Sequence, residues 1–340
     1  MNSDIKNPPR ITHIMRTVIN SSLLFSCLAF GSASQANIIF QFDYGSNSGT
    51  GFWDPTDGAS RQAALSTVAN EFSSMFGSHF SNSGTILLAA SATNLPESSG
   101  LASAGSQFIG YGVAGFTAAE VVKTKLRGGS DLNGAAADGT IEVNFGQPWQ
   151  LDLSMPVSNT QYDFYSTIYH ELTHAIGFSS NIDQSGNPVF GTKAAGEWGA
   201  FDRFLVDKDG NTVVNTDFSL NQGVWDAASV GGASPAAGMF FNGAYAVAAN
   251  GGAAVGLYTP TTWDEGSSVS HLDTDNPALA KMMMTHTSLT GPGARDYSAI
   301  EVGMMRDLGY TVTAVPEPEI YAMMFAGLGM VGWFVRRRKA

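Results

Sequence analysis

Short apolar runs and longer amphipathic segments alternate through the first half of the chain. Three apolar runs are predicted to be strands, namely residues 38–43, 85–90 and 139–145. Residues 59–76 and 117–126 place apolar side chains on one face and are predicted to be helices, the second capped by Thr117. We interpret this mixture of strands and helices as an α+β fold.

The strongest helix pattern covers residues 159–176. Asn159 or Thr160 can cap its beginning, and Asp163 lies in its first turns. Gly177 directly follows, and glycine commonly ends a helix because it adopts positive φ without strain. The segment therefore predicts a helix with defined ends.

Beyond this helix the apolar pattern becomes irregular. Residues 201–207 and 212–215 are predicted to form a hairpin around a turn at 208–211. A short helix is expected at 244–249 and a last helix at 297–308.

The predicted hairpin turn contains part of a calcium-binding pattern. Asp207, Asp209 and Asn211 stand at alternate positions, as oxygen ligands do in such loops. The acidic residue that closes a calcium loop is missing at the expected distance. We therefore expect a plain turn, with Ca²⁺ as the weaker alternative.

The N-terminal segment has the features of a targeting signal. Residues 1–36 combine a basic start, an apolar stretch and the small-residue sequence Ser34-Gln35-Ala36, which predicts a secretory signal peptide. The single cysteine, Cys27, lies inside this segment. The exported chain would therefore contain no disulfide, which a core of this size does not require.

The C-terminal segment, residues 313–340, contains Pro316-Glu317-Pro318, the apolar run 320–335 and a terminal cluster of three arginines and one lysine. The run is at the lower limit for a membrane span, so it predicts transient or permanent membrane contact. These three parts in this order resemble the PEP-CTERM sorting signal of Gram-negative bacteria. The resemblance implies export across the inner membrane, processing by an exosortase, and a location at the cell surface or outside the cell.

The distribution of charge restricts the partners. The formal net charge is −12, and seven of the 17 lysine and arginine residues lie in the two terminal segments. The residues between them are therefore strongly acidic. Such a surface repels nucleic acid, which we exclude as a partner.

The sequence His170-Glu171-Leu172-Thr173-His174 lies in the strongest predicted helix. Side chains four positions apart share one face of a helix, so His170 and His174 can bind one Zn²⁺ ion. Glu171 lies beside them and could take a proton from a zinc-bound water, because zinc lowers the pKa of that water to near 7. The motif therefore predicts a metallohydrolase.

Catalytic zinc needs a third protein ligand. The other histidines between the terminal segments are His79, His271 and His286. Glu197 is a further candidate, because thermolysin-like enzymes use a glutamate downstream of the histidine pair. Glu197 lies between two glycines near Trp198, however, which is poor helix material.

The surroundings of the motif resemble the metzincin peptidases. The pattern is His170-Glu171-x-x-His174-x-x-Gly177-Phe178, in which the glycine turns the chain out of the helix. Most metzincins place a third histidine three residues after that glycine, where this chain has Ser180. The leishmanolysin-type members share this departure, because they insert a long segment before a Gly-Ser-His-like loop.

Three later segments continue this resemblance: Ser270-His271-Leu272-Asp273, Met282-Met283-Met284-Thr285 and Asp307-Leu308-Gly309-Tyr310. The resemblance implies that His271 is the third ligand and that Met284, or Met283, forms the hydrophobic base under the metal. It also makes Tyr297 a candidate to assist the oxyanion, with core packing as the alternative. Asp273 is a candidate to orient His271 through its second nitrogen, or else an exposed loop residue.

These expectations define an α+β, metzincin-like domain over residues 37–312, with lobes 37–177 and 178–312 and a cleft between them. The edge strand of its twisted sheet could accept an extended peptide, and His286 is expected in the cleft or behind the ligands. The expected function is that of a secreted zinc endopeptidase acting on proteins or peptides, with Glu171 as general base. The alternatives are a catalytically inactive surface or extracellular-matrix protein and a thermolysin-like enzyme using Glu197.

Overall fold

The computed structural model describes most of the chain between its two terminal segments. The described residues are 37–98, 100–189, 196–232 and 237–313, with 326–328, 330, 336 and 337 near the C-terminus. The predicted signal peptide and most of the predicted apolar run 320–335 lie outside them. Within the described residues, no helix combines the length and the hydrophobicity that a membrane span requires.

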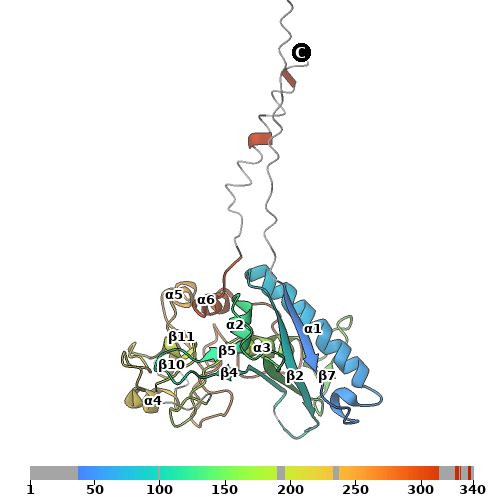
Figure 1. Cartoon of the computed structure of the whole chain (residues 1–340), viewed down its shortest axis with the longest axis horizontal. Coiled ribbons are helices and arrows are strands. Elements are labelled where there is room, and N and C mark those ends of the chain that lie inside the picture. Colours follow the sequence, from blue (N-terminus) through green and yellow to red (C-terminus); the bar gives the residue numbers. More distant parts are fainter. Residues whose placement is uncertain are drawn as a thin grey trace, which may run out of the picture. The chain divides into compact units, whose positions relative to one another are not determined.

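The first half of the described chain builds a four-stranded sheet (Figure 1). Its strands lie in the order β1 (Ile38–Asp43), β2 (Gly84–Thr93), β6 (Gly139–Asn144) and β3 (Ala102–Ser106). The first three are parallel, and β3 pairs with β6 in the antiparallel direction at one edge. The three predicted strands are confirmed. Strand β3 is not predicted from the sequence, because its residues Ala-Ser-Ala-Gly-Ser contain no apolar run.

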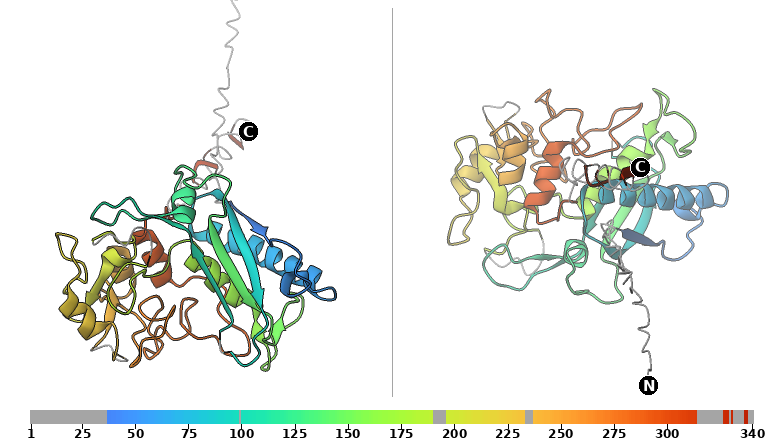
Figure 2. Two further views of the ribbon diagram at one scale, coloured as in Figure 1. Left: turned by 60° about the horizontal axis from the view of Figure 1, so that its bottom comes forward. Right: turned by 90° about the horizontal axis from the view of Figure 1, so that it is seen from above.

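Helices α1 (Gly58–His79) and α3 (Phe164–Ala175) pack together on one face of this sheet (Figure 2). The ring of Phe72 on α1 lies edge-on to Phe40 of β1, with ring centroids 5.8 Å apart, and to Tyr169 of α3 at 5.9 Å. Burial of such aromatic side chains contributes strongly to a core. This packing fixes α3 against the sheet, and with it the histidine motif.

The helix predicted at 59–76 is confirmed as α1, whereas the helix predicted at 117–126 begins later than expected. It is α2 (Val121–Leu126), and its cap position is Glu120. The two preceding residues form β5 (Ala119–Glu120), which pairs with β4 (Phe108–Ile109). Because this pairing holds the backbone extended, Thr117 cannot cap the helix, and that prediction is wrong.

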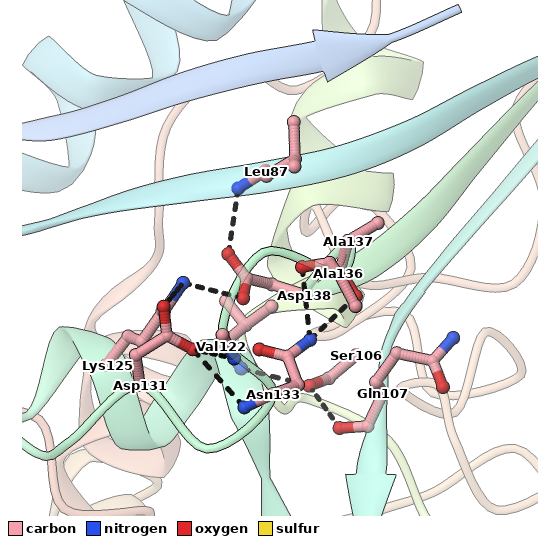
Figure 3. A network of polar contacts seen from close by, with 11 residues as sticks. Leu87, Ser106, Gln107, Val122, Lys125, Asp131, Asn133, Ala136, Ala137 and Asp138 are labelled. Atoms are coloured by element: carbon pink, nitrogen blue, oxygen red, sulfur yellow. Dashed lines mark hydrogen bonds and ion pairs between the residues drawn. The ribbon is translucent and has the colours of Figure 1, made fainter. Parts of the chain in front are cut away.

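A buried ion pair ties α2 to the sheet (Figure 3). Asp138, which is fully buried, accepts hydrogen bonds from the Leu87 amide at 2.8 Å and from Lys125 Nζ at 2.7 Å. Lys125 also reaches Asp131 at 3.0 Å. A buried carboxylate is stable only with such partners. The network therefore fixes the loop that leads from α2 into β6.

The motif helix α3 is shorter than predicted. Residues 162 and 163 form β8 (Tyr162–Asp163), which pairs with β7 (Trp149–Gln150), so the helix starts at Phe164. Its cap is Asp163, which accepts from the amides of Tyr165 at 3.1 Å and Ser166 at 3.3 Å. Caps at Asn159 or Thr160 are therefore wrong predictions.

Asp163 also holds a later loop against the start of α3. Its carboxylate binds Arg295 through Nε at 3.0 Å and Nη2 at 2.8 Å, and it accepts from the Gly293 amide at 3.1 Å. The Asp163 side chain is 3% exposed and that of Arg295 is 40% exposed, so the carboxylate of this bidentate pair is buried while the guanidinium partly reaches water. Asp163 thus joins the motif helix to residues 293–295.

Replacement of Asp163 by alanine is expected to lower the free energy of unfolding by about 3 kcal/mol, because it removes a helix cap and unpairs Arg295. Urea unfolding followed by circular dichroism measures this loss. Asp152→Ala, which removes an exposed turn residue bonded to Ser154, is the matched control and should change stability by less than about 0.5 kcal/mol. Equal effects of the two substitutions would contradict the anchoring role of Asp163.

The second half of the described chain forms a small three-stranded sheet and three helices. The strands lie in the order β11 (Val255–Gly256), β10 (Met239–Phe241) and β9 (Leu205–Asp207), and η2 (Asp202–Phe204) precedes β9. The helices are α4 (Gln222–Ala228), α5 (Ala244–Ala249) and α6 (Ala299–Asp307). The helices predicted at 244–249 and 297–308 are confirmed.

The predicted hairpin at 201–215 forms only in part. The turn at 208–211 exists, and the carboxylate of Asp207 closes it by accepting from the amides of Asp209 and Asn211, both at 2.8–2.9 Å. The returning segment runs antiparallel to β9 through a bridge between Val206 and Thr212 and a hydrogen bond from the Val213 amide to the Leu205 carbonyl oxygen at 3.1 Å, while the other edge of β9 pairs with β10. The hairpin is therefore confirmed in its turn and its pairing, although residues 212–215 form no regular strand.

Candidate metal centre

Two histidines of α3 and one from a distant loop bring their ring nitrogens together. The Nε2 atoms of His170 and His174 lie 2.9 Å apart, and each lies 3.0 Å from Nε2 of His271. His170 and His174 are one helical turn apart on α3, and His271 follows a series of turns at 265–270. In the part of the chain that the structure describes, no other group of three metal-ligating side chains comes this close.

Each of the three rings is held by its other nitrogen, Nδ1, which donates to a backbone carbonyl oxygen. The pairs are His170 with Met283 at 2.8 Å, His174 with Phe178 at 2.6 Å and His271 with Ser267 at 2.9 Å. A carbonyl oxygen only accepts, so each Nδ1 carries the hydrogen and each Nε2 presents a lone pair. Three lone pairs that converge in this way repel one another unless a cation lies between them.

The surroundings keep the three rings neutral. Burial lowers the pKa of His170 to about 4 and that of His174 to about 3. Burial also lowers the pKa of His271 well below its ordinary value, and the neighbouring histidines add to that effect. Neutral imidazole is the form that binds metal ions.

The residues present fit a catalytic zinc ion. Zinc–nitrogen distances are about 2.0–2.1 Å, so two ligands of a tetrahedral ion stand roughly 3.3 Å apart. The observed spacings of 2.9 and 3.0 Å lie within a few tenths of an ångström of that value. Three histidines leave a fourth position open, and carbonyl oxygens bound to Nδ1 are the usual outer support of such ligands.

Glu171 lies on the cavity wall between the histidines and the sheet edge. It is 6% exposed, and its carboxylate receives a backbone hydrogen bond from Ala104 of β3. Burial raises the pKa of Glu171 to about 8, although the bond from Ala104 opposes this shift. A carboxyl group near its pKa at neutral pH can both accept and give up a proton, and a nearby cation would favour the carboxylate.

The methionine segment contacts the cluster through its backbone. Met283 supplies the carbonyl oxygen that holds His170, and the carbonyl oxygen of Met284 accepts from the Leu272 amide at 2.8 Å. The Met284 amide donates in turn to the buried Glu301 of α6 at 2.8 Å. Met284 is fully buried, and its place as the base under the metal stays a prediction.

Two predicted helpers have other roles. The second nitrogen of His271 bonds to Ser267, whereas the carboxylate of Asp273 accepts from the Asp275 amide at 2.9 Å. Asp273 is 5% exposed, so it is neither the orienting group nor an exposed loop residue, and both predictions are wrong. Tyr297 donates to or accepts from Thr173 Oγ1 at 2.9 Å inside the core, which confirms core packing rather than assistance to an oxyanion.

The alternative ligands lie elsewhere. Glu197 is 2% exposed and accepts from the amides of Tyr111 at 2.6 Å and Gly112 at 3.0 Å, so it fixes a loop instead of joining the cluster. His79 pairs with Asp296 at 2.8 Å at the end of α1. The structure therefore brings His271, and neither Glu197 nor His79, to the histidine pair.

His286 lies in the cavity wall, as expected for a cleft residue. Its ring stacks on Tyr258 with centroids 3.5 Å apart, and its Nδ1 lies 3.1 Å from Thr274 Oγ1. The stack places two aromatic rings in the cavity wall.

Gly177 is required by its surroundings as well as by its backbone. It has φ +105°, which side-chain-bearing residues rarely adopt. A Cβ at this position would also collide with Oε2 of Glu120. The sharp turn after α3 therefore lets Glu120 reach the cavity wall.

The histidine cluster opens into a cavity of about 790 Å³. Its wall includes the edge strand β3 and residues 264–267 and 285–289. The sequence does not predict the loop residues of this wall, nor the roles of Glu120 and Glu301. A single acidic residue outside a known motif has no characteristic spacing that would identify it. An acidic residue three positions after a serine, as in Ser298 and Glu301, does indicate a capping box, which forms here.

Comparisons with known proteins bear on one end of the chain. Residues 314–339 match the family model of the PEP-CTERM protein-sorting motif. This match confirms the predicted sorting signal, which indicates export and cell-surface or extracellular sorting in Gram-negative bacteria and implies recognition by an exosortase. No curated protein and no solved structure matches the chain.

Proposed function

We propose that this chain is an exported zinc-dependent endopeptidase. The observation that carries the proposal is the convergence of three Nε2 lone pairs within 3.0 Å of one another, beside a buried glutamate on the wall of an open cavity. The arrangement supplies a metal site with an open position and a proton acceptor next to it.

The chain's own residues have distinct parts in this proposal. His170, His174 and His271 would hold the ion, which when bound activates water and polarises the substrate carbonyl. Glu171 would accept the proton from the attacking water and return it to the departing amine, because the bound cation would favour its carboxylate form.

The edge of β3 favours an extended peptide as the substrate. Leu101 and Gln107, at the two ends of the strand, bond toward β6 and its preceding residue. Backbone groups alternate along a strand, so Ala102, Ala104 and Ser106 face away from β6, toward the cavity. An extended peptide can pair with such an edge through its main chain, which positions it across the histidine cluster.

The test is hydrolysis of casein or gelatin by the purified chain, loaded with one equivalent of zinc. Removal of the metal with 1,10-phenanthroline is expected to lower the rate at least about 100-fold, and added zinc should restore it. A protein that carries zinc but cleaves no protein substrate would contradict the proposal and favour an inactive surface or matrix protein with this fold.

A further inference from the structure

A second buried carboxyl group, that of Glu120, lies on the cavity wall beyond His174. Glu120 ends β5, is 2% exposed and faces the turn at Gly177. The proposed hydrolysis makes no use of this side chain. Its position beside the histidine cluster calls for a different explanation.

The two oxygens of Glu120 have different surroundings. Oε1 accepts a hydrogen bond from Nζ of Lys123, which is itself 5% exposed. Oε2 is buried and has no hydrogen-bond partner within the described residues. A buried polar atom without a partner costs roughly 1–3 kcal/mol, and more when it is charged. A hydrogen-bond donor that enters the cavity would remove this cost.

The charge of the cavity wall specifies which donor fits. The carboxyl groups in the described wall belong to Glu120, Glu171, Asp264 and Glu265, and that wall contains no lysine or arginine. Lys123 lies behind Glu120 and is not part of it. These carboxyl groups, with no lysine or arginine beside them on the described wall, favour a cationic side chain over a neutral or acidic one.

We infer that the cavity beyond His174 is a specificity pocket in which Oε2 of Glu120 receives the cationic end of a lysine or arginine side chain; the inference rests on the proposed endopeptidase function. Ser106 at the end of β3 and Glu120 both line this cavity, so a peptide that paired with β3 would enter the space that Glu120 borders. The occupant is therefore one residue of the bound peptide at a fixed distance from the bond that is cut.

Digestion of a proteome-derived peptide library by the zinc-loaded chain, with cleavage sites identified by mass spectrometry, tests the inference. Lysine and arginine are expected to be enriched at one fixed position relative to the cleaved bond. Glu120→Gln should reduce this enrichment about tenfold, as the loss of one charge-assisted hydrogen bond implies. The matched control Glu142→Gln changes an exposed glutamate on β6 and should keep the enrichment.

Glu120→Gln leaves Lys123 buried without its charged partner, which can impair folding. The double variant Glu120→Leu with Lys123→Met replaces the pair by apolar side chains and should lose the enrichment while it remains folded. A wild-type protein that cleaves many peptides without enrichment of lysine or arginine at any position would overturn the pocket but leave the endopeptidase function intact.

A second measurement separates the pocket from the reaction. If the wild-type chain cleaves nothing, the proposed function fails, and equilibrium binding then decides on the pocket. The zinc-loaded chain should bind acetyl-Ala-Ala-Lys-Ala-Ala-amide about tenfold more tightly than the peptide with norleucine in place of lysine. Equal affinities would overturn the inference.

Discussion

Replacement of Glu171 by glutamine is expected to lower the rate of peptide hydrolysis by about 10³-fold while one zinc ion per chain is retained. Glutamine keeps the size of the side chain and its contact with β3, but it cannot accept a proton, and a positioned general base contributes roughly 10²–10⁴-fold. Casein hydrolysis and zinc content by atomic absorption measure the two quantities on the same preparation.

Glu142→Gln is the matched control for Glu171→Gln, because Glu142 is exposed on β6 outside the cavity wall. It should retain the wild-type rate and zinc content. If Glu171→Gln hydrolysed casein as fast as the control, Glu171 would not be the general base. If Glu171→Gln lost its zinc, the carboxylate would instead be needed to hold the metal.

Replacement of His271 by alanine is expected to weaken zinc binding by more than about 100-fold and to abolish hydrolysis. Loss of an outer-shell partner alone costs 10–100-fold in metal affinity, so loss of a direct ligand should cost more. The carbonyl oxygen of Ser267 holds the ring in place at the cavity wall. Competition with a chromogenic chelator measures the affinity.

His286→Ala is the matched control, because this histidine lies in the same cavity but outside the group of three. It should keep zinc at one ion per chain. Retention of zinc by His271→Ala, together with its loss in Glu197→Gln, would replace the three-histidine site by the thermolysin-like arrangement. The position of Glu197, which bonds to the backbone of residues 111 and 112, argues against that result.

The motif helix was predictable because its signals are local. The spacing of His170 and His174 places both rings on one helix face, and Gly177 marks the helix end, as its φ of +105° confirms. The start of the helix was not predictable in this way. Asp163 caps it because a short strand pair forms at residues 149 and 162, and such long-range pairing leaves no periodic pattern.

The third histidine of the cluster, His271, was predicted by comparing the few available histidines and by the resemblance to metzincins, not by a local pattern. His271 lies 97 positions after His174, a separation that no local pattern spans. Its support by Ser267 rather than Asp273 depends on the turns that precede it, and these have no apolar period. The partners of Glu120 and Glu301 are likewise set by packing, so their roles appear only in three dimensions.

In the proposed site, His170, His174 and His271 together hold one zinc ion at the wall of the cavity. Crystals soaked with a hydroxamate, with anomalous diffraction measured on both sides of the zinc absorption edge, test it most directly. We expect a single zinc peak within about 2.0–2.1 Å of the three Nε2 atoms, with the hydroxamate at the remaining position. A peak that excludes His271, or a hydroxamate bound away from these histidines, would contradict it.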